Sequence, residues 1–216
     1  MSRLARPLAI ALLLGTALLG AGAAAHPMLA GDAAAQLRVI AATPYWRALH
    51  LLMLAGSGLV IGGLWVRALD DRPDRADRLA SSAAPLLAAL AVIALGVAIN
   101  ALNIAFMAGA GWHMAAAFQQ GRTEMGPVFE ATHPIGLMAA RFGNFLVALG
   151  ALALGWLEWQ DASSPRWLAW LAWLAAAGGL VGVFFFDEAS RLALAAVALL
   201  AGWQVATGVR ALRGSA

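Results

Sequence analysis

Five uninterrupted apolar blocks constrain this chain more than any other feature of its sequence. Crossing the hydrocarbon layer of a bilayer takes roughly 20 helical residues at about 1.5 Å each. Strands of a membrane barrel need only about 10 residues and alternate in polarity, so they do not account for blocks of this length. The sequence therefore predicts an all-α, polytopic membrane helix bundle with about five transmembrane helices. The blocks cover approximately residues 48–66, 84–110, 135–157, 167–186 and 191–209.

The composition supports a single membrane domain without a separate soluble domain. Of the 216 residues, 62% are hydrophobic and only 12% are charged, whereas a soluble domain averages about half apolar and a quarter charged. All 14 basic residues are arginines, and the net charge of +3 comes without the basic stripe of a nucleic-acid-binding protein. The chain has no cysteine, which excludes disulfides and Cys-ligated zinc sites. We expect a lipid bilayer as partner and no nucleic acid.

The N-terminus has the three parts of a secretory signal peptide. Two arginines within the first six residues precede an apolar run over residues 8–22 and a small-residue ending at 23–25. This order predicts a signal peptide over residues 1–25, cleaved after Ala25, followed by a single helical membrane domain over residues 26–216. An uncleaved signal anchor is the alternative.

The distribution of arginine orients the predicted bundle. Positively charged short loops stay on the cytoplasmic side of a membrane. With the mature N-terminus outside, nine arginines are cytoplasmic and five are extracytoplasmic. We therefore predict an inner (plasma) membrane protein with an extracytoplasmic mature N-terminus and a cytoplasmic C-terminus. The nine cytoplasmic arginines are Arg3, Arg6, Arg67, Arg72, Arg75, Arg78, Arg166, Arg210 and Arg213.

Histidine and methionine are confined to one side in this topology. All four histidines, and every methionine after the initiator, fall at the predicted extracytoplasmic ends and loops. Methionines that only fill a core would be spread over all the helices. Thioethers are soft donors that suit Cu(I), and imidazole binds copper in both oxidation states. The sequence therefore predicts a copper site at the extracytoplasmic face, with the candidate ligands His26, His50, Met53, His113, Met114 and His133.

Amides and glycines inside the apolar blocks predict how the helices pack. Four amides are expected to hydrogen-bond between helices: Asn100, Asn103, Asn144 and Gln204. Two GxxxG pairs are expected to bring helices into close contact: Gly58 with Gly62, and Gly178 with Gly182. No internal repeat is evident in the sequence.

Three segments resemble the copper-resistance protein D family. Residues 49–52, leading to the Gly-Gly-Leu of residues 62–64, are similar to that family's opening helix, where a His-Leu start runs into a Gly-Gly pair. Residues 78–83 resemble its basic loop, and residues 132–142 its third span. The tryptophan usual between the histidine and the glycine pair is missing here. The resemblance implies copper movement across the inner membrane, beside a periplasmic copper-binding protein, with His50 as the residue carried over.

Two other functions compete with copper handling. His50 with either His113 or His133 would supply axial ligands for a b-type heme in electron transfer or oxidation. A Met-rich outer surface would also suit a structural or assembly subunit of a larger membrane complex. The sequence contains no nucleophile motif, phosphate loop or HExxH motif, so it favours a protein that is not an enzyme.

Overall fold

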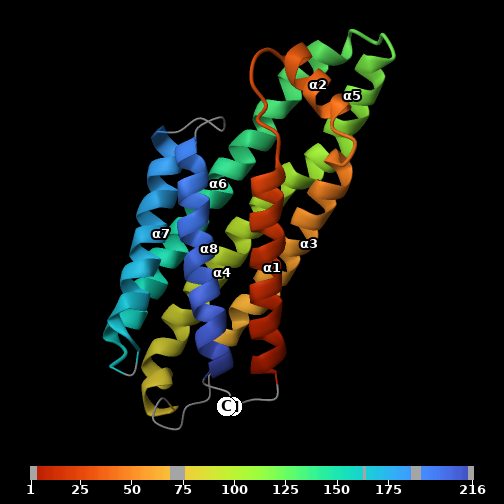
Figure 1. Cartoon of the computed structure of the whole chain (residues 1–216). Helices are drawn as coiled ribbons and strands as arrows, with labels where there is room; N and C mark the ends of the chain where they lie inside the picture. Colours follow the sequence, from red (N-terminus) through yellow and green to blue (C-terminus); the bar gives the residue numbers. More distant parts are fainter. Residues whose placement is uncertain (1–3, 69–75, 163, 186–190, 214–216) are drawn as a thin grey trace.

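The computed structural model describes residues 4–68, 76–162, 164–185 and 191–213, and every regular element within them is a helix. This confirms the predicted all-α bundle (Figure 1). The long helices are α1 (Ala5–Ala25), α3 (Trp46–Leu64), α4 (Ala76–Phe106), α6 (Met125–Gln160), α7 (Arg166–Phe185) and α8 (Arg191–Arg213). The short elements are α2 (Ala33–Ala42), the 3-10 turn η1 (Trp65–Arg67), the π-helix η3 (Met107–Gly111) and α5 (Trp112–Gln119).

The long helices form one bundle of membrane-spanning dimensions. Among the described residues, five helical segments are long and apolar enough to cross a membrane: α1, α3 with η1, the continuous rod from α4 to α5, α6 and α7. Helix α8 packs against both α1 and α7 within the same bundle (Figure 1). The short helices α2 and α5 gather at one end, called the α2/α5 end below, and α1 begins at the opposite end. The fold is that of a multi-pass membrane protein.

The segment 111–134, expected as a long outer loop, is almost entirely helical. Helix α5 and the first turns of α6 occupy it, and residues 120–124 connect them. Pro134 does not end α6, although it lacks a backbone donor. The carbonyl left without that donor belongs to Glu130, which is an exposed residue. The candidate ligands of this segment are therefore held on helices.

Two antiparallel helix pairs, α1 with α3 and α4 with α6, pack backbone to backbone through glycines. A β-carbon added to Gly15 would lie 2.7 Å from the carbonyl oxygen of Gly56, and one added to Gly96 would lie 2.6 Å from that of Gly143. Each pair is joined at the α2/α5 end by a short helix, so α1–α2–α3 and α4–α5–α6 are two copies of one motif. The structure thus repeats a three-helix arrangement although no internal repeat is evident in the sequence.

The glycines that make these contacts differ from one of the predicted pairs. A β-carbon on Gly58 or Gly62 would meet nothing within 4 Å, so the GxxxG prediction is wrong for this pair. The contacts on α3 come instead from Gly56 and Gly63, which are seven residues apart. A seven-residue spacing returns to nearly the same helix face after two turns, and Gly58 and Gly62 lie off that face.

Two of the predicted amide contacts are confirmed. Asn100 Nδ2 donates to Asn144 Oδ1 at 2.7 Å between α4 and α6. The Gln204 side-chain amide of α8 lies 2.9 Å from the Thr16 hydroxyl of α1, at a buried position. Asn103 Oδ1 is buried and has no hydrogen-bond partner in the described part of the chain.

Candidate metal site at the end of the bundle

Trp46 organises the α2/α5 end of the bundle. Its side chain is fully buried in an apolar cluster supplied by α2, α3, η3, α5 and α6. The indole Nε1 donates to the carbonyl oxygen of Met107 at 3.0 Å. That carbonyl lies in η3, and single-turn π-helices occur frequently at functional sites. The other buried residues of the cluster are Leu37, Ile40, Met107, Met114, Ala115 and Phe129.

The backbone of Trp46 also orients His50. The Nδ1 atom of His50 lies 2.8 Å from the Trp46 carbonyl oxygen, one helical turn earlier. Because a carbonyl only accepts, Nδ1 carries the proton, and the neutral ring presents an unprotonated Nε2. A hydrogen bond of this kind is the usual device that fixes the tautomer and ring orientation of a metal-binding histidine. His50 is only 3% exposed.

His26, directly after α1, brings a second imidazole to the same place. Its ring centroid lies 5.1 Å from that of His50, and the rings of His26 and His50 lie 4.8 and 4.4 Å from that of Trp46. Burial, and after it the electrostatic effect of the neighbouring His50, lowers the pKa of His26 from the ordinary 6.5 to about 4. The ring is therefore neutral near pH 7, which is the form that binds metals.

The spacing of these two rings fits a shared metal ion. An imidazole nitrogen binds a metal at about 2.0 Å, and the ring centroid lies about 1.1 Å behind that nitrogen, so each centroid is about 3.1 Å from the ion. Centroids 5.1 Å apart then correspond to a nitrogen–metal–nitrogen angle of roughly 110°. Such a bent arrangement leaves room for a third ligand. Two axial imidazoles on opposite faces of a heme would need centroids about 6.2 Å apart, with the macrocycle between them.

The side chain of Met53 fills the space at Gly22, in the contact between α1 and α3. A β-carbon on Gly22 would lie 2.8 Å from Met53 Sδ, so the methionine occupies the space of the absent side chain. Gly22 precedes His26 by four residues, and Met53 follows His50 by three, so each pair shares one helix face. The sulfur therefore lies about one helical turn from the imidazoles, at the same contact between α1 and α3.

The remaining predicted ligands have other surroundings. His113 is exposed on α5 and makes an edge contact with Trp112, whereas Met114 turns into the buried apolar cluster. Consecutive helical residues point about 100° apart, which separates this pair. His133 is buried against Phe129, with ring centroids 4.5 Å apart. The ring contacts of the described residues join His26 to His50, and they join neither His113 nor His133 to that pair.

The nature of the donors limits which ions could bind. In the ranges that the structure describes, no group of three or more His, Cys, Asp or Glu side chains could hold a metal ion. An ion at the His26–His50 pair would take a third bond from a donor of another kind, and the Met53 thioether is such a donor. Two imidazoles and a thioether are a soft, neutral set that suits Cu(I).

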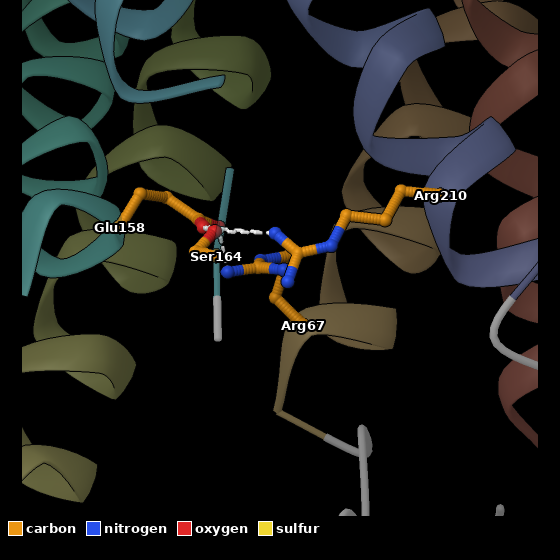
Figure 2. A network of polar contacts seen from close by, with 4 residues as sticks. All are labelled: Arg67, Glu158, Ser164 and Arg210. Carbon is orange, nitrogen blue, oxygen red and sulfur yellow. Dashed lines mark hydrogen bonds and ion pairs between the residues drawn. The ribbon is translucent and has the colours of Figure 1, made fainter. Parts of the chain in front are cut away.

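A buried ion-pair network occupies the opposite end of the bundle (Figure 2). Glu158, near the end of α6, is 3% exposed and forms ion pairs with Arg67 of η1 and Arg210 of α8. Ser164, in the connection from α6 to α7, donates to the Glu158 carboxylate and accepts from Arg210. The network ties three elements together that are far apart in sequence.

Sequence reasoning did not find this network. It assigned Arg67 and Arg210 to membrane topology and gave Glu158 no role. The available signal was the position of Glu158 in an apolar, tryptophan-rich segment, where an ionisable side chain needs a partner. Sequence spacing does not reveal that partner, because the two arginines come from separate helices.

Comparison with known proteins gave no match: no protein-family model, no curated protein and no solved structure corresponds to this chain. What the chain does must therefore follow from the chemistry of its own residues.

Proposed function

We propose that the protein binds copper through the rings of His26 and His50 and the thioether of Met53, and that it serves copper transport or copper homeostasis. The observation that carries this proposal is the 5.1 Å separation of the two imidazole centroids, together with the backbone hydrogen bond that orients the His50 ring. Two imidazoles close enough to share one ion are the minimum that a two- or three-coordinate ion requires.

The donor set selects copper over the other common metals. Cu(I) accepts thioether and imidazole in low coordination numbers, and the same imidazoles retain Cu(II) after oxidation. Zinc prefers four ligands, commonly with thiolates that this chain lacks. Calcium and magnesium require oxygen-rich sites, and no carboxylate takes part in the His26–His50 contact. Copper at this position would join α1 to α3 across their helix contact.

The α2/α5 end is proposed to face the extracytoplasmic side of a bacterial-type inner membrane. The excess of arginine at the other end supports this orientation through the positive-inside rule. A site at this end would receive copper from the periplasm, and the resemblance of the His50 segment to the copper-resistance protein D family supports a periplasmic copper-binding partner. A periplasmic protein that delivers copper would reach His26 before His50, because His50 is the more deeply buried of the two.

The test is a copper titration of purified protein in detergent. Cu(I) is added in the presence of a competing chelator, and bound copper and iron are measured after dialysis. The proteins compared are the wild type and the variants His26→Ala, His50→Ala, Met53→Leu and His113→Ala. We expect one copper per wild-type chain. Loss of either imidazole should weaken binding about 100-fold or more, since even outer-shell partners of a metal contribute 10- to 100-fold. His113→Ala is the matched control and should bind as wild type, because His113 is exposed and its ring contact is with Trp112, not with His26 or His50.

Three outcomes would reject the proposal. Copper bound equally well by His50→Ala and wild type would show that the pair is not the site. A red preparation with a Soret absorption band, lost in His50→Ala, would favour a b-type heme instead. A colourless protein that binds no copper would leave the assembly-subunit function, for which loss of complex formation in the same variants would be diagnostic.

A further inference from the structure

We infer that α1 remains in the mature protein as a transmembrane helix, although its sequence has the form of a cleavable signal peptide. The observation that carries this inference is the close correspondence between the α1–α3 contact and the α4–α6 contact. Helix α4 lies in the interior of the chain and is a permanent part of the bundle. A helix that makes the same contacts at equivalent positions has the same structural role.

The α1–α3 contact is built around one glycine crossing. A β-carbon on Gly15 would lie 2.7 Å from the Gly56 carbonyl oxygen and 2.8 Å from the Val60 backbone nitrogen. Leu12, three residues before Gly15, packs directly against Gly63, which follows Gly56 by seven residues. These distances leave no room for any side chain at either glycine, so the two backbones are in direct contact.

The α4–α6 contact repeats this arrangement position by position. A β-carbon on Gly96 would lie 2.6 Å from the Gly143 carbonyl oxygen and 2.8 Å from the Val147 backbone nitrogen. Ile93, three residues before Gly96, packs directly against Gly150, which follows Gly143 by seven residues. The spacings of three, four and seven residues agree between the two contacts, as do the glycines and valines, and a branched aliphatic residue stands at the remaining position (Leu12 or Ile93). A segment destined for removal would have no reason to reproduce them.

Contacts between α1 and α8 point independently to the same conclusion. The buried Thr16 hydroxyl lies 2.9 Å from the Gln204 side-chain amide. A β-carbon on Gly208 would lie 2.8 Å from Leu13 Cγ, so α8 also approaches α1 closely. Without α1, the amide of Gln204 would face lipid with no partner from that helix, and an unsatisfied polar group in hydrocarbon is unfavourable by several kcal/mol.

The length of α1 suits a spanning helix. It contains 21 residues, which corresponds to about 31 Å and matches the roughly 30 Å hydrocarbon layer. If α1 is retained, His26 contributes its ring alone to the metal site and has no free amino group. The inference does not depend on copper binding, because cleavage after Ala25 would leave both histidines in the chain.

The experiment measures the mass and the stability of protein purified from membranes through a C-terminal tag. Intact-mass spectrometry distinguishes the whole chain, 22.3 kDa before the tag, from a chain that begins at His26. Thermal melting in detergent then compares wild type with Gly15→Leu and with Gly58→Leu, the matched control, at which an added β-carbon meets no described residue within 4 Å. We expect the full mass, a clearly lower melting temperature for Gly15→Leu, and no change for Gly58→Leu.

Either of two results would overturn the inference. A mature N-terminus at His26 would show that α1 is removed. A full-length chain whose melting temperature is unchanged by Gly15→Leu would show that α1 is present but not packed in the bundle. Should Gly15→Leu fail to accumulate, the wild-type mass alone decides the question.

Discussion

Replacing Glu158 with glutamine tests whether the ion-pair network stabilises the bundle. The carboxylate is 3% exposed, and its partners Arg67 and Arg210 have side chains 11% and 12% exposed. Glutamine keeps the shape of glutamate but removes its charge, so two largely buried guanidinium groups lose their counter-charge. Removing one partner of a buried ion pair typically destabilises a protein by about 3–5 kcal/mol.

The lower part of this range is expected for Glu158→Gln, because the new amide oxygen still accepts a hydrogen bond from Ser164. For a chain of this size, 1 kcal/mol corresponds to about 2–4 °C in melting temperature. With about 3 kcal/mol lost, the predicted decrease is about 6–12 °C.

Thermal melting followed by circular dichroism in one detergent measures this decrease. The control is Glu124→Gln, because Glu124 forms the same kind of pair with Arg122 while both side chains are about 60% exposed. Exposed pairs contribute little to stability, so the control should melt with the wild type. A Glu158→Gln protein that melts within 1–2 °C of wild type would refute the assigned role of the network, since a shift that small corresponds to under about 1 kcal/mol.

Three further predictions concern packing and protonation. Gly143→Leu should destabilise the bundle strongly, because the leucine side chain would collide with the Gly96 backbone, whereas Gly58→Leu should not. Equal melting temperatures for the two variants would contradict the glycine contact between α4 and α6. Asn100→Val should lower stability by about 0.6–1.7 kcal/mol, the range for interhelical hydrogen bonds in membranes, and Asn144→Val should add little in the double variant. The pKa of His26 is lowered from 6.5 to about 4, so the unfolded chain takes up that proton first as the pH falls. The melting temperature of the wild type should be level above about pH 6.5 and should fall between pH 6.5 and 4. His26→Asn should flatten that fall; a variant with the same pH profile as wild type would contradict the role given to His26.

The helical architecture can be predicted from the sequence because the lipid bilayer restricts the backbone so strongly. Apolar blocks long enough to cross a bilayer have no alternative to helices, and the predicted amide contact between Asn100 and Asn144 follows from the cost of burying polar groups in lipid. The helical segment 111–134 was read as a loop because its polarity interrupts the apolar pattern. This segment is polar because it extends out of the apolar layer, and the chain stays helical after it leaves that layer.

The glycine contacts and the candidate site depend on tertiary geometry that local patterns do not contain. A GxxxG pair and a seven-residue glycine pair occupy different helix faces, and the crossing of α1 with α3 decides which face is used. In the same way, His26 and His50 meet because α1 ends where α3 begins. The sequence placed every histidine at one end of the bundle, but only the fold separates His113 and His133 from the contacting pair.

X-ray absorption at the copper edge of the Cu(I)-loaded protein tests the shared site most directly. Two nitrogen neighbours at roughly 2.0 Å and one sulfur neighbour at roughly 2.3 Å are expected from two imidazoles and one thioether. The sulfur signal should disappear in Met53→Leu, and one nitrogen should disappear in His26→Ala. A copper environment made of oxygen alone, or one that stays the same in both variants, would contradict the account.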